Sequence, residues 1–238
     1  MDLRVDVFSD VICPWCFVGK RRLEAAIGLL GDEAQVQVTW RPFQLNPTMP
    51  REGVERQQYR ARKFRSLARS EALDAQLAAT GREVGIDFRF DLMQRTPNTF
   101  EAHRLLRLAH ERGVQDGVAE ALFRGYFLEG ADLGDHAALA EIAAGAGLDR
   151  DEVARYLASD KGVAQVADEE ALGRDLGIDG VPFFVVEEKY AISGAQPAEY
   201  LAAAFREILQ REQGSREPVA AGIASGAACS PDDPAACP

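Results

Sequence analysis

The sequence has 238 residues, of which 47% are hydrophobic and 27% are charged, as is usual for a soluble globular protein. No uninterrupted apolar run reaches about 18 residues and residues 1–9 lack the features of a secretory signal, so we expect no membrane association and a cytoplasmic location. The net charge of −11 argues against nucleic acid as a partner, because phosphate binding requires a basic surface.

The first elements predict a β–α–β unit. Leu3, Val5 and Val7 alternate with charged residues, which is typical of a strand. Apolar residues then recur at helical spacing over residues 17–30, and a second alternating stretch covers residues 35–42. A Cys-Pro-Trp-Cys motif lies between the first strand and the helix.

The middle of the chain, residues 51–177, shows helical patterns and no convincing strand. Two pairs of residues have the spacing of a capping box, in which one side chain caps the helix and a glutamate three residues later bonds back to it. These pairs are Asn98 with Glu101 and Asp149 with Glu152. We therefore expect two of the helices to begin beside Asn98 and Asp149.

Strand formers return late in the chain. Residues 183–186 and 190–193 are separated by a short turn and predict a hairpin. A helix is expected from Pro197 to about residue 212, because proline suits the first turn of a helix. The composition of residues 214–238, rich in Ala, Gly, Ser, Pro and Asp, predicts a flexible tail.

This order of elements predicts an α/β fold, in which a half-thioredoxin motif at each end flanks a helical insertion. We assign residues 1–49 and 150–213 to a discontinuous thioredoxin-like domain. Residues 50–149 form an inserted all-helical domain, which we expect to cover the active-site cleft.

A run of basic residues interrupts the acidic composition. Such a run is usually a solvated helix face, which we favour, and a patch that binds an anionic ligand is the alternative. The basic residues are Arg51, Arg56, Arg60, Arg62, Lys63, Arg65 and Arg69.

The two N-terminal cysteines have the spacing of a redox pair. Disulfide exchange requires an exposed thiolate and a second thiol close enough to displace the substrate. At a helix start, the partial positive charge stabilises the Cys13 thiolate, Pro14 fits the first turn, and Cys16 lies inside that turn, more buried. We therefore expect Cys13 to attack the substrate and Cys16 to resolve the mixed disulfide.

Half of a zinc site is the alternative interpretation of this pair. A zinc ribbon needs a second pair at suitable spacing, whereas Cys229 and Cys237 lie in the predicted tail. We favour redox chemistry and expect no bound metal. The tail cysteines form either a structural disulfide or a tethered second redox pair that exchanges with Cys13.

Two further residues are candidates for the active site. Pro182 stands at the mouth of a strand, which often marks only the strand start. In thioredoxin-like sites, however, a cis-proline faces the cysteine pair, and the Val181–Pro182 peptide bond is placed for that role. A histidine such as His103 most often has a structural role, and the alternative is that it lines the active-site cleft.

Together these motifs resemble the FrnE-like branch of the DsbA family over about residues 3–210. The motifs are residues 8–16 (FSDVICPWC), 40–43 (WRPF), 102–104 (AHR), 180–184 (GVPFF) and 192–197 (ISGAQP). The resemblance implies a thioredoxin fold with an inserted helical domain, a nucleophilic Cys13, a resolving Cys16 and a cis peptide bond at Val181–Pro182.

We expect the partners to be protein thiols and disulfides or small thiols, with glutathione as a candidate co-substrate and no other cofactor. We expect the protein to be a monomer or a homodimer. Trp15 stands where DsbA has a histidine between its cysteines. Since the intervening residues tune thiolate stability, we expect a less oxidising pair, closer to that of an isomerase or a reductase.

Two other functions are open alternatives. A glutathione-dependent isomerase, similar to the 2-hydroxychromene-2-carboxylate isomerases, would share this fold, but those enzymes typically carry serine at the position of Cys13. A chaperone that holds unfolded proteins on an apolar cleft would work without thiols. Disulfide exchange accounts for both Cys13 and Cys16, and we favour it.

Overall fold

Strand β1 (Asp2–Ser9) lies inside a four-stranded sheet in the computed structural model, which describes residues 2–214. It pairs in parallel with β2 (Gln35–Pro42) and antiparallel with β5 (Phe183–Val186). Strand β6 (Tyr190–Ser193) pairs with β5, so the order across the sheet is β2–β1–β5–β6. The predicted hairpin of β5 and β6 is confirmed.

Alternate side chains of β1 point into the core, as predicted. Leu3, Val5 and Val7 are buried, and the residues between them are more exposed. Because β1 and β2 are parallel, the chain must cross over between them, and α1 (Pro14–Leu30) with the 3₁₀ turn Gly31–Glu33 makes that connection.

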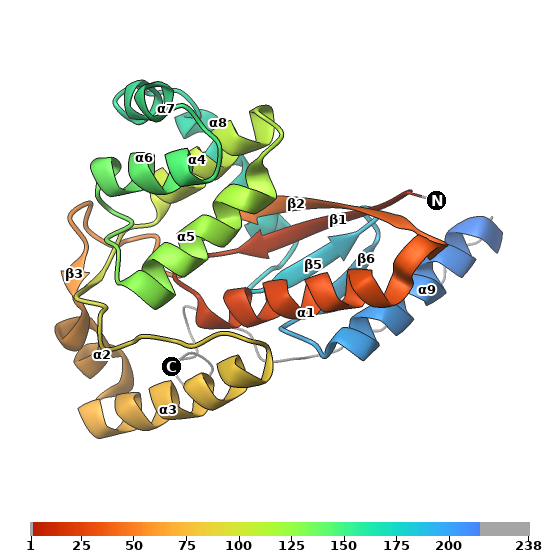
Figure 1. Ribbon diagram of the computed structural model, residues 1–238, viewed down its shortest axis with the longest axis horizontal. Coiled ribbons are helices and arrows are strands. Elements are labelled where there is room, and N and C mark those ends of the chain that lie inside the picture. The colour runs from red at the N-terminus through yellow and green to blue at the C-terminus, as the bar shows by residue number, and fades with distance from the viewer. Residues whose placement is uncertain (1, 215–238) are drawn as a thin grey trace.

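Helix α9 (Ala198–Gly214) packs beside α1 along the sheet, as Figure 1 shows. Leu23 and Ala26 of α1 and Leu201 and Phe205 of α9 are buried. This arrangement of sheet and helices is the thioredoxin fold that the sequence predicted.

The other helices of the described residues lie between β2 and β5 in the sequence. They are α2 (Arg56–Phe64), α3 (Leu67–Glu83), α4 (Phe100–Glu111), α5 (Gln115–Glu129), α6 (His136–Gly145), α7 (Arg150–Leu157) and α8 (Val163–Asp175). Helices α4, α5 and α8 contact β2, and α2 and α3 lie together at the opposite side of Figure 1 from α9. Within residues 2–214, no helix combines the length and the apolar character that a membrane span requires.

The expectation of helices alone in residues 51–177 is wrong in one detail. Strands β3 (Val54–Glu55) and β4 (Arg95–Thr96) form a small antiparallel sheet. Two residues per strand are too few to show an alternating pattern. The close approach of β3 to β4 requires a glycine at position 53. Gly53 has a φ of 67°, and a β-carbon there would lie 2.6 Å from the Thr96 carbonyl oxygen.

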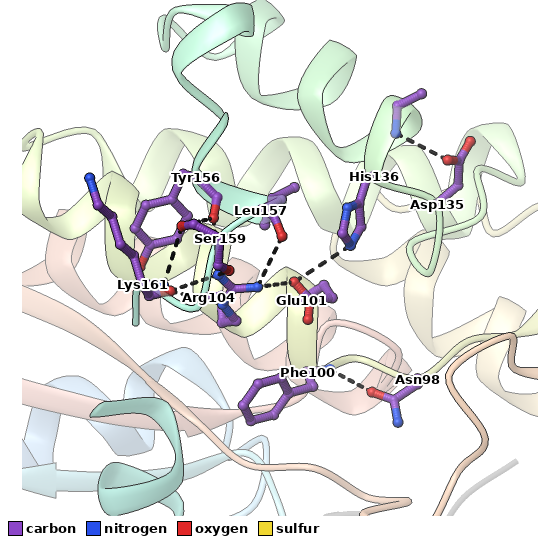
Figure 2. Close-up of polar contacts among 11 residues, drawn as sticks. Asn98, Phe100, Glu101, Arg104, Asp135, His136, Tyr156, Leu157, Ser159 and Lys161 are labelled. Atoms are coloured by element: carbon purple, nitrogen blue, oxygen red, sulfur yellow. Dashed lines mark hydrogen bonds and ion pairs between the residues drawn. The ribbon is translucent and has the colours of Figure 1, made fainter. Parts of the chain in front are cut away.

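The predicted capping box of Asn98 and Glu101 is wrong. The residue at the N-cap of α4 is Thr99, and the Asn98 side chain instead accepts a hydrogen bond from the Phe100 N–H at 2.9 Å (Figure 2). Glu101 does not bond back to the helix start, because its carboxylate pairs with the Arg104 guanidinium at 2.5 Å.

Both ends of α7 are capped by side chains. At the start, the Asp149 carboxylate accepts a hydrogen bond from the Glu152 N–H at 2.7 Å, so the predicted cap at Asp149 is confirmed. The predicted return bond from Glu152 is wrong, because its carboxylate pairs with the Arg112 guanidinium. At the end, buried Arg104 of α4 donates to backbone carbonyls of the last turn of α7 and of the connection that follows it (Figure 2). The acceptors are the carbonyl oxygens of Tyr156, Leu157, Ser159 and Lys161. One side chain therefore joins α4 to the connection between α7 and α8.

Candidate active site

Cys13 is the N-cap residue of α1. Its backbone is extended (φ −88°, ψ 113°), and Pro14 occupies the first helical turn. The Cys13 N–H donates to the Asp10 carbonyl at 2.9 Å, and the Cys13 carbonyl accepts from the Cys16 N–H at 3.0 Å. These bonds bring the two free thiols within one turn of each other, where they interact directly.

The residue after the motif anchors the start of α1. Phe17 is fully buried and stacks on Phe123 of α5, with 5.2 Å between the ring centroids. It also meets Phe88 edge-on, at a centroid distance of 6.1 Å. Aromatic pairs of this kind contribute about 0.5–1.5 kcal/mol beyond the burial of their surface. The inserted helices thus help to fix the position of the cysteine pair.

A second loop meets the pair where the chain enters β5. The Val181–Pro182 peptide bond is cis, and the Cys13 thiol donates a hydrogen bond to the Val181 carbonyl oxygen at 3.6 Å. The Pro182 carbonyl accepts from the Gly194 N–H at 2.8 Å. Helix α1 lies so close that a β-carbon on Gly19 would be 2.8 Å from Pro182 Cγ. The structure therefore brings together the two segments that the sequence singled out.

Both cysteines are fully buried, each with 0% of its surface exposed, so the expectation of an exposed Cys13 is wrong. The sulfur faces the carbonyl of Val181, which is itself fully buried. Close packing of Pro182 on Gly19 holds that loop against α1. A substrate disulfide can reach Cys13 only when the groups around the sulfur shift.

The thiol of Cys16 is held in its neutral form. Burial raises the pKa of Cys16 well above its usual range, and the hydrogen bond and charge of Cys13 raise it further. The Ser9 hydroxyl and the Asp10 backbone act in the opposite direction. A neutral thiol is a weak nucleophile, so Cys16 must lose its proton before it can attack a disulfide.

Three buried titratable groups lie behind the cysteine loop. The Asp10 carboxylate accepts hydrogen bonds from the N–H groups of Leu45 at 2.8 Å and Ile12 at 3.4 Å, and burial raises the pKa of Asp10 to about 6. Burial and the charge of Asp10 raise the pKa of Glu170 to about 7. Burial lowers the pKa of His103 to about 4, and its Nε2 lies 3.8 Å from Asp10 Oδ1.

Asp10 and Glu170 were not among the residues expected from the sequence. A signal existed for Asp10, a carboxylate three positions before the cysteine pair at the apolar end of a strand. Glu170 has no such signal, since other acidic residues surround it on α8. His103 lines a cavity of about 160 Å³ that also includes Trp40, and it does not line the space beside Pro14.

A small cavity of about 40 Å³ adjoins the cysteine loop. Ile12 and Pro14, the residues on either side of Cys13, form part of its wall. Part of the predicted basic run forms another part of the wall, on α2. The basic lining residues are Arg56, Arg60 and Lys63.

The interpretation of the basic run as a solvated face is therefore wrong for these three residues. It holds for Arg62, Arg65 and Arg69, which are exposed. Arg60 is buried, and its guanidinium donates to the Ser70 carbonyl at 2.9 Å. Packing of α2 against α3 thus turns one side of the basic run toward the active site.

A larger cavity of about 580 Å³ lies between the loop after β2 and the helices α4, α6, α7 and α8. Arg104 lines it, but its nitrogens point to the carbonyls at the end of α7 and to Glu101 (Figure 2). The Glu101 carboxylate also lies 3.6 Å from His136 Nε2. Arg104 therefore has a structural role.

The remaining candidates from the sequence, Cys229 and Cys237, lie outside the described residues. Within residues 2–214, no three or more His, Cys, Asp or Glu side chains are grouped so that they could hold a metal ion. The described site comprises the two thiols of Cys13 and Cys16, the loop at Val181 and the buried groups behind them.

Comparison with known proteins identifies the family. A family model, the DSBA-like thioredoxin domain, matches residues 4–206. The chain belongs to the DsbA-like thioredoxin family. The prediction from the motifs is thereby confirmed, and this DsbA-family chain is an oxidoreductase with the thioredoxin fold.

Solved structures resemble this DsbA-family chain over most of its length. A probable DsbA oxidoreductase from Streptomyces coelicolor is 35% identical, covers 92% of this chain and 94% of its own, and has a TM-score of 0.81. The cytosolic disulfide reductase DsbM from Pseudomonas aeruginosa, solved with GSH, is 18% identical over 88% and 98% of the chains (TM-score 0.56). A 2-hydroxychromene-2-carboxylate isomerase is 13% identical over 90% and 100% (TM-score 0.62). At these identities, the last two show the fold alone.

Proposed function

We propose that this protein exchanges disulfides with protein substrates or small thiols through its Cys-Pro-Trp-Cys motif. The supporting observation is the setting of Cys13, which caps α1, interacts with the thiol of Cys16 and lies 3.6 Å from the Val181 carbonyl oxygen. Membership of the DsbA-like family supports the same chemistry.

Exchange begins when the Cys13 thiolate attacks one sulfur of a substrate disulfide. A bond forms between Cys13 and the substrate, the substrate S–S bond breaks, and the other substrate sulfur leaves as a thiolate that takes up a proton. Cys16 then loses its proton and attacks Cys13 Sγ, which forms the Cys13–Cys16 disulfide and releases the second substrate thiol. The substrate gains the two electrons that the cysteine pair loses. The reverse sequence oxidises a substrate dithiol.

The protonated state of Cys16 favours isomerisation. Once Cys13 is bonded to the substrate its charge is lost, and burial alone keeps the pKa of Cys16 raised. Resolution then waits for a proton to leave Cys16. In that time a second substrate thiol can attack the mixed disulfide, which rearranges the substrate without net oxidation. Together with Trp15 between the cysteines, this supports an isomerase or reductase rather than a strong oxidant.

We propose that the protein works in the cytoplasm and that glutathione supplies electrons to the pair. A cytosolic disulfide reductase of the same fold, DsbM, was solved with GSH, which supports this assignment. A small thiol also suits a buried pair, because it needs less displacement of the groups around Cys13 than a folded protein does.

The test measures insulin reduction and the refolding of scrambled ribonuclease. Cys229 and Cys237 are replaced by Ser in every protein, so that only the N-terminal pair reacts. The parent protein is expected to be active in both assays, and Cys13→Ser to abolish both activities. Cys16→Ser is expected to abolish insulin reduction and to accumulate a mixed disulfide at Cys13, which intact-mass measurement detects.

Full activity of Cys13→Ser would overturn the proposal. An inactive parent that still suppresses aggregation after replacement of both Cys13 and Cys16 would indicate a holdase chaperone instead. Glutathione-dependent isomerisation of a small substrate that persists in Cys13→Ser would indicate the isomerase alternative.

A further inference from the structure

The cavity beside Pro14 has the size of one small functional group. A buried water molecule requires about 10–15 Å³ of cavity volume. This cavity of about 40 Å³ therefore admits a group of about three heavy atoms, such as a carboxylate. Ile12 and Pro14 flank Cys13 and both line the cavity, so a group bound there lies beside the residue that carries the reactive sulfur.

The charges around this cavity do not balance. Arg56 and Arg60 share one partner, Asp74, at 2.9 Å and 2.6 Å, and Asp74 does not line the cavity. Among residues 2–214, no carboxylate lies within ion-pair distance of Lys63. Three cationic side chains therefore line this cavity, and Asp74 is the one carboxylate of the described residues that forms ion pairs with any of them. This local excess of positive charge occurs on a chain whose net charge is −11.

Asp10 is the other acidic group in this region. The charge of Lys63 acts on the Asp10 carboxyl, but that carboxyl accepts hydrogen bonds from the Leu45 and Ile12 N–H groups and does not line the cavity. Tyr59 is also engaged, since its hydroxyl donates to Asn46 Oδ1 at 2.7 Å. The Lys63 ammonium is therefore the donor left for a ligand.

The behaviour of Arg60 is consistent with a surplus of positive charge. Burial lowers the pKa of Arg60 to about 10, and although the charge of Asp74 raises it, the charge of Arg56 lowers it further. An anion in the cavity would relieve this repulsion.

We propose that Lys63, with Arg56 and Arg60, binds a carboxylate of the substrate while its sulfur reacts at Cys13. The inference rests on the proposed disulfide exchange and specifies its substrates: thiols or disulfides that carry a carboxylate close to the reacting sulfur. Glutathione supplies such a carboxylate, and so does a protein cysteine with an acidic neighbour.

Two pairs of substrates test the inference and distinguish these sources. The first pair is glutathione disulfide and its fully esterified form. The second is two peptide disulfides that differ only in the residue beside the cysteine, Glu in one and Gln in the other. For each pair, the ratio of kcat/KM for the acidic over the neutral substrate is measured with the full chain.

The acidic substrate is expected to be preferred in at least one pair. Lys63→Gln is expected to lower the ratio about tenfold, equivalent to about 1.4 kcal/mol. Lys63→Arg keeps the charge and is expected to keep most of the preference. Arg62→Gln removes an exposed charge from the same helix and is the matched control, with the ratio unchanged. The substrate pair that responds identifies the source of the carboxylate.

A wild-type ratio near one in both pairs would overturn the inference. So would a ratio that Lys63→Gln leaves unchanged, or one that Arg62→Gln lowers equally, since the latter would reflect only overall charge. Turnover of the neutral substrates that is lost in Cys13→Ser verifies disulfide exchange separately, so failure of the carboxylate site and failure of the proposed function are distinguishable.

Discussion

The thiol of Cys13 lies 3.6 Å from the carbonyl oxygen of Val181, a residue 168 positions away in the sequence. The thiol form donates a hydrogen bond to this oxygen, whereas the thiolate has no proton to donate and faces the negative end of the carbonyl dipole. Ionisation of Cys13 therefore removes this hydrogen bond between α1 and the loop before β5.

The two thiols should react with alkylating agents in a fixed order. Cys13 and Cys16 are equally buried, so burial does not make one of them more reactive than the other. The raised pKa of Cys16 keeps that thiol neutral near pH 7, and a neutral thiol reacts slowly. In a reduced Cys229→Ser/Cys237→Ser protein, we expect iodoacetamide to modify Cys13 first and Cys16 only at strongly alkaline pH. Peptide mass spectrometry reads the order, and faster modification of Cys16 would contradict it.

Gly19 is predicted to be essential for the fit between α1 and Pro182. The β-carbon of Gly19→Ala would lie 2.8 Å from Pro182 Cγ, so the loop must shift, at a cost of about 1–3 kcal/mol. We expect a lower free energy of unfolding and slower insulin reduction. Gly28→Ala on the same helix is the control, because its β-carbon meets open space and it should stabilise the protein by up to about 1 kcal/mol. Equal effects of the two substitutions would refute the steric argument.

Much of the site could be predicted because its chemistry is local in the sequence. Cys13 and Cys16 are two residues apart, and the strand before them and the helix after them have strong apolar patterns. The contact of this segment with Val181 and Pro182 followed only from the family resemblance, because no local pattern encodes a contact between distant segments.

The features that could not be predicted depend on tertiary packing. The burial of Cys13 arises from a loop that arrives from the other end of the fold. Glu170 becomes a functional candidate only because α8 places it near Asp10. The side of α2 that carries Lys63 faces the active site because of the neighbours of α2, not because of its own sequence.

Arg104 is predicted to contribute more to stability than any exposed ion pair. Arg104→Lys keeps the charge but cannot reach the carbonyls at the end of α7 together with Glu101, and we expect a loss of about 3 kcal/mol. Arg112→Gln removes an exposed pair with Glu152 and should change stability by less than about 0.5 kcal/mol. Urea unfolding measures both, and a loss below about 1 kcal/mol for Arg104→Lys would contradict the structural role.

The buried groups behind the cysteines predict a pH-dependent stability. Folding raises the pKa of Asp10 from 3.8 to about 6, so the stability from its protonated form is complete at low pH and is lost as the pH rises through 6. Glu170 acts in the same direction, up to pH 7. His103 acts oppositely: folding lowers its pKa from 6.5 to about 4, so its contribution is present above pH 6.5 and is lost as the pH falls.

Asp10→Asn removes the pH-dependent contribution of Asp10. It also removes part of the contribution of Glu170, because the charge of Asp10 helps to raise the pKa of Glu170. Between pH 5 and pH 7, the free energy of unfolding of the variant should rise relative to that of the wild type by about 1 kcal/mol. The comparison uses the slope with pH, because loss of a backbone acceptor lowers stability at every pH. Asp151→Asn, at an exposed position, is the control. Parallel pH profiles of Asp10→Asn and the wild type would rule out this coupling.

Because β1 lies between β2 and β5, the sheet cannot be completed until most of the chain has been synthesised. The cysteine pair leaves the ribosome early, and Val181 follows 168 residues after Cys13. At about 5–20 residues per second, this delay is roughly 10–30 s. During that time the nascent chain carries two ordinary, accessible thiols, open to any oxidant or thiol in the compartment. Their selective reactivity develops only when translation has delivered β5.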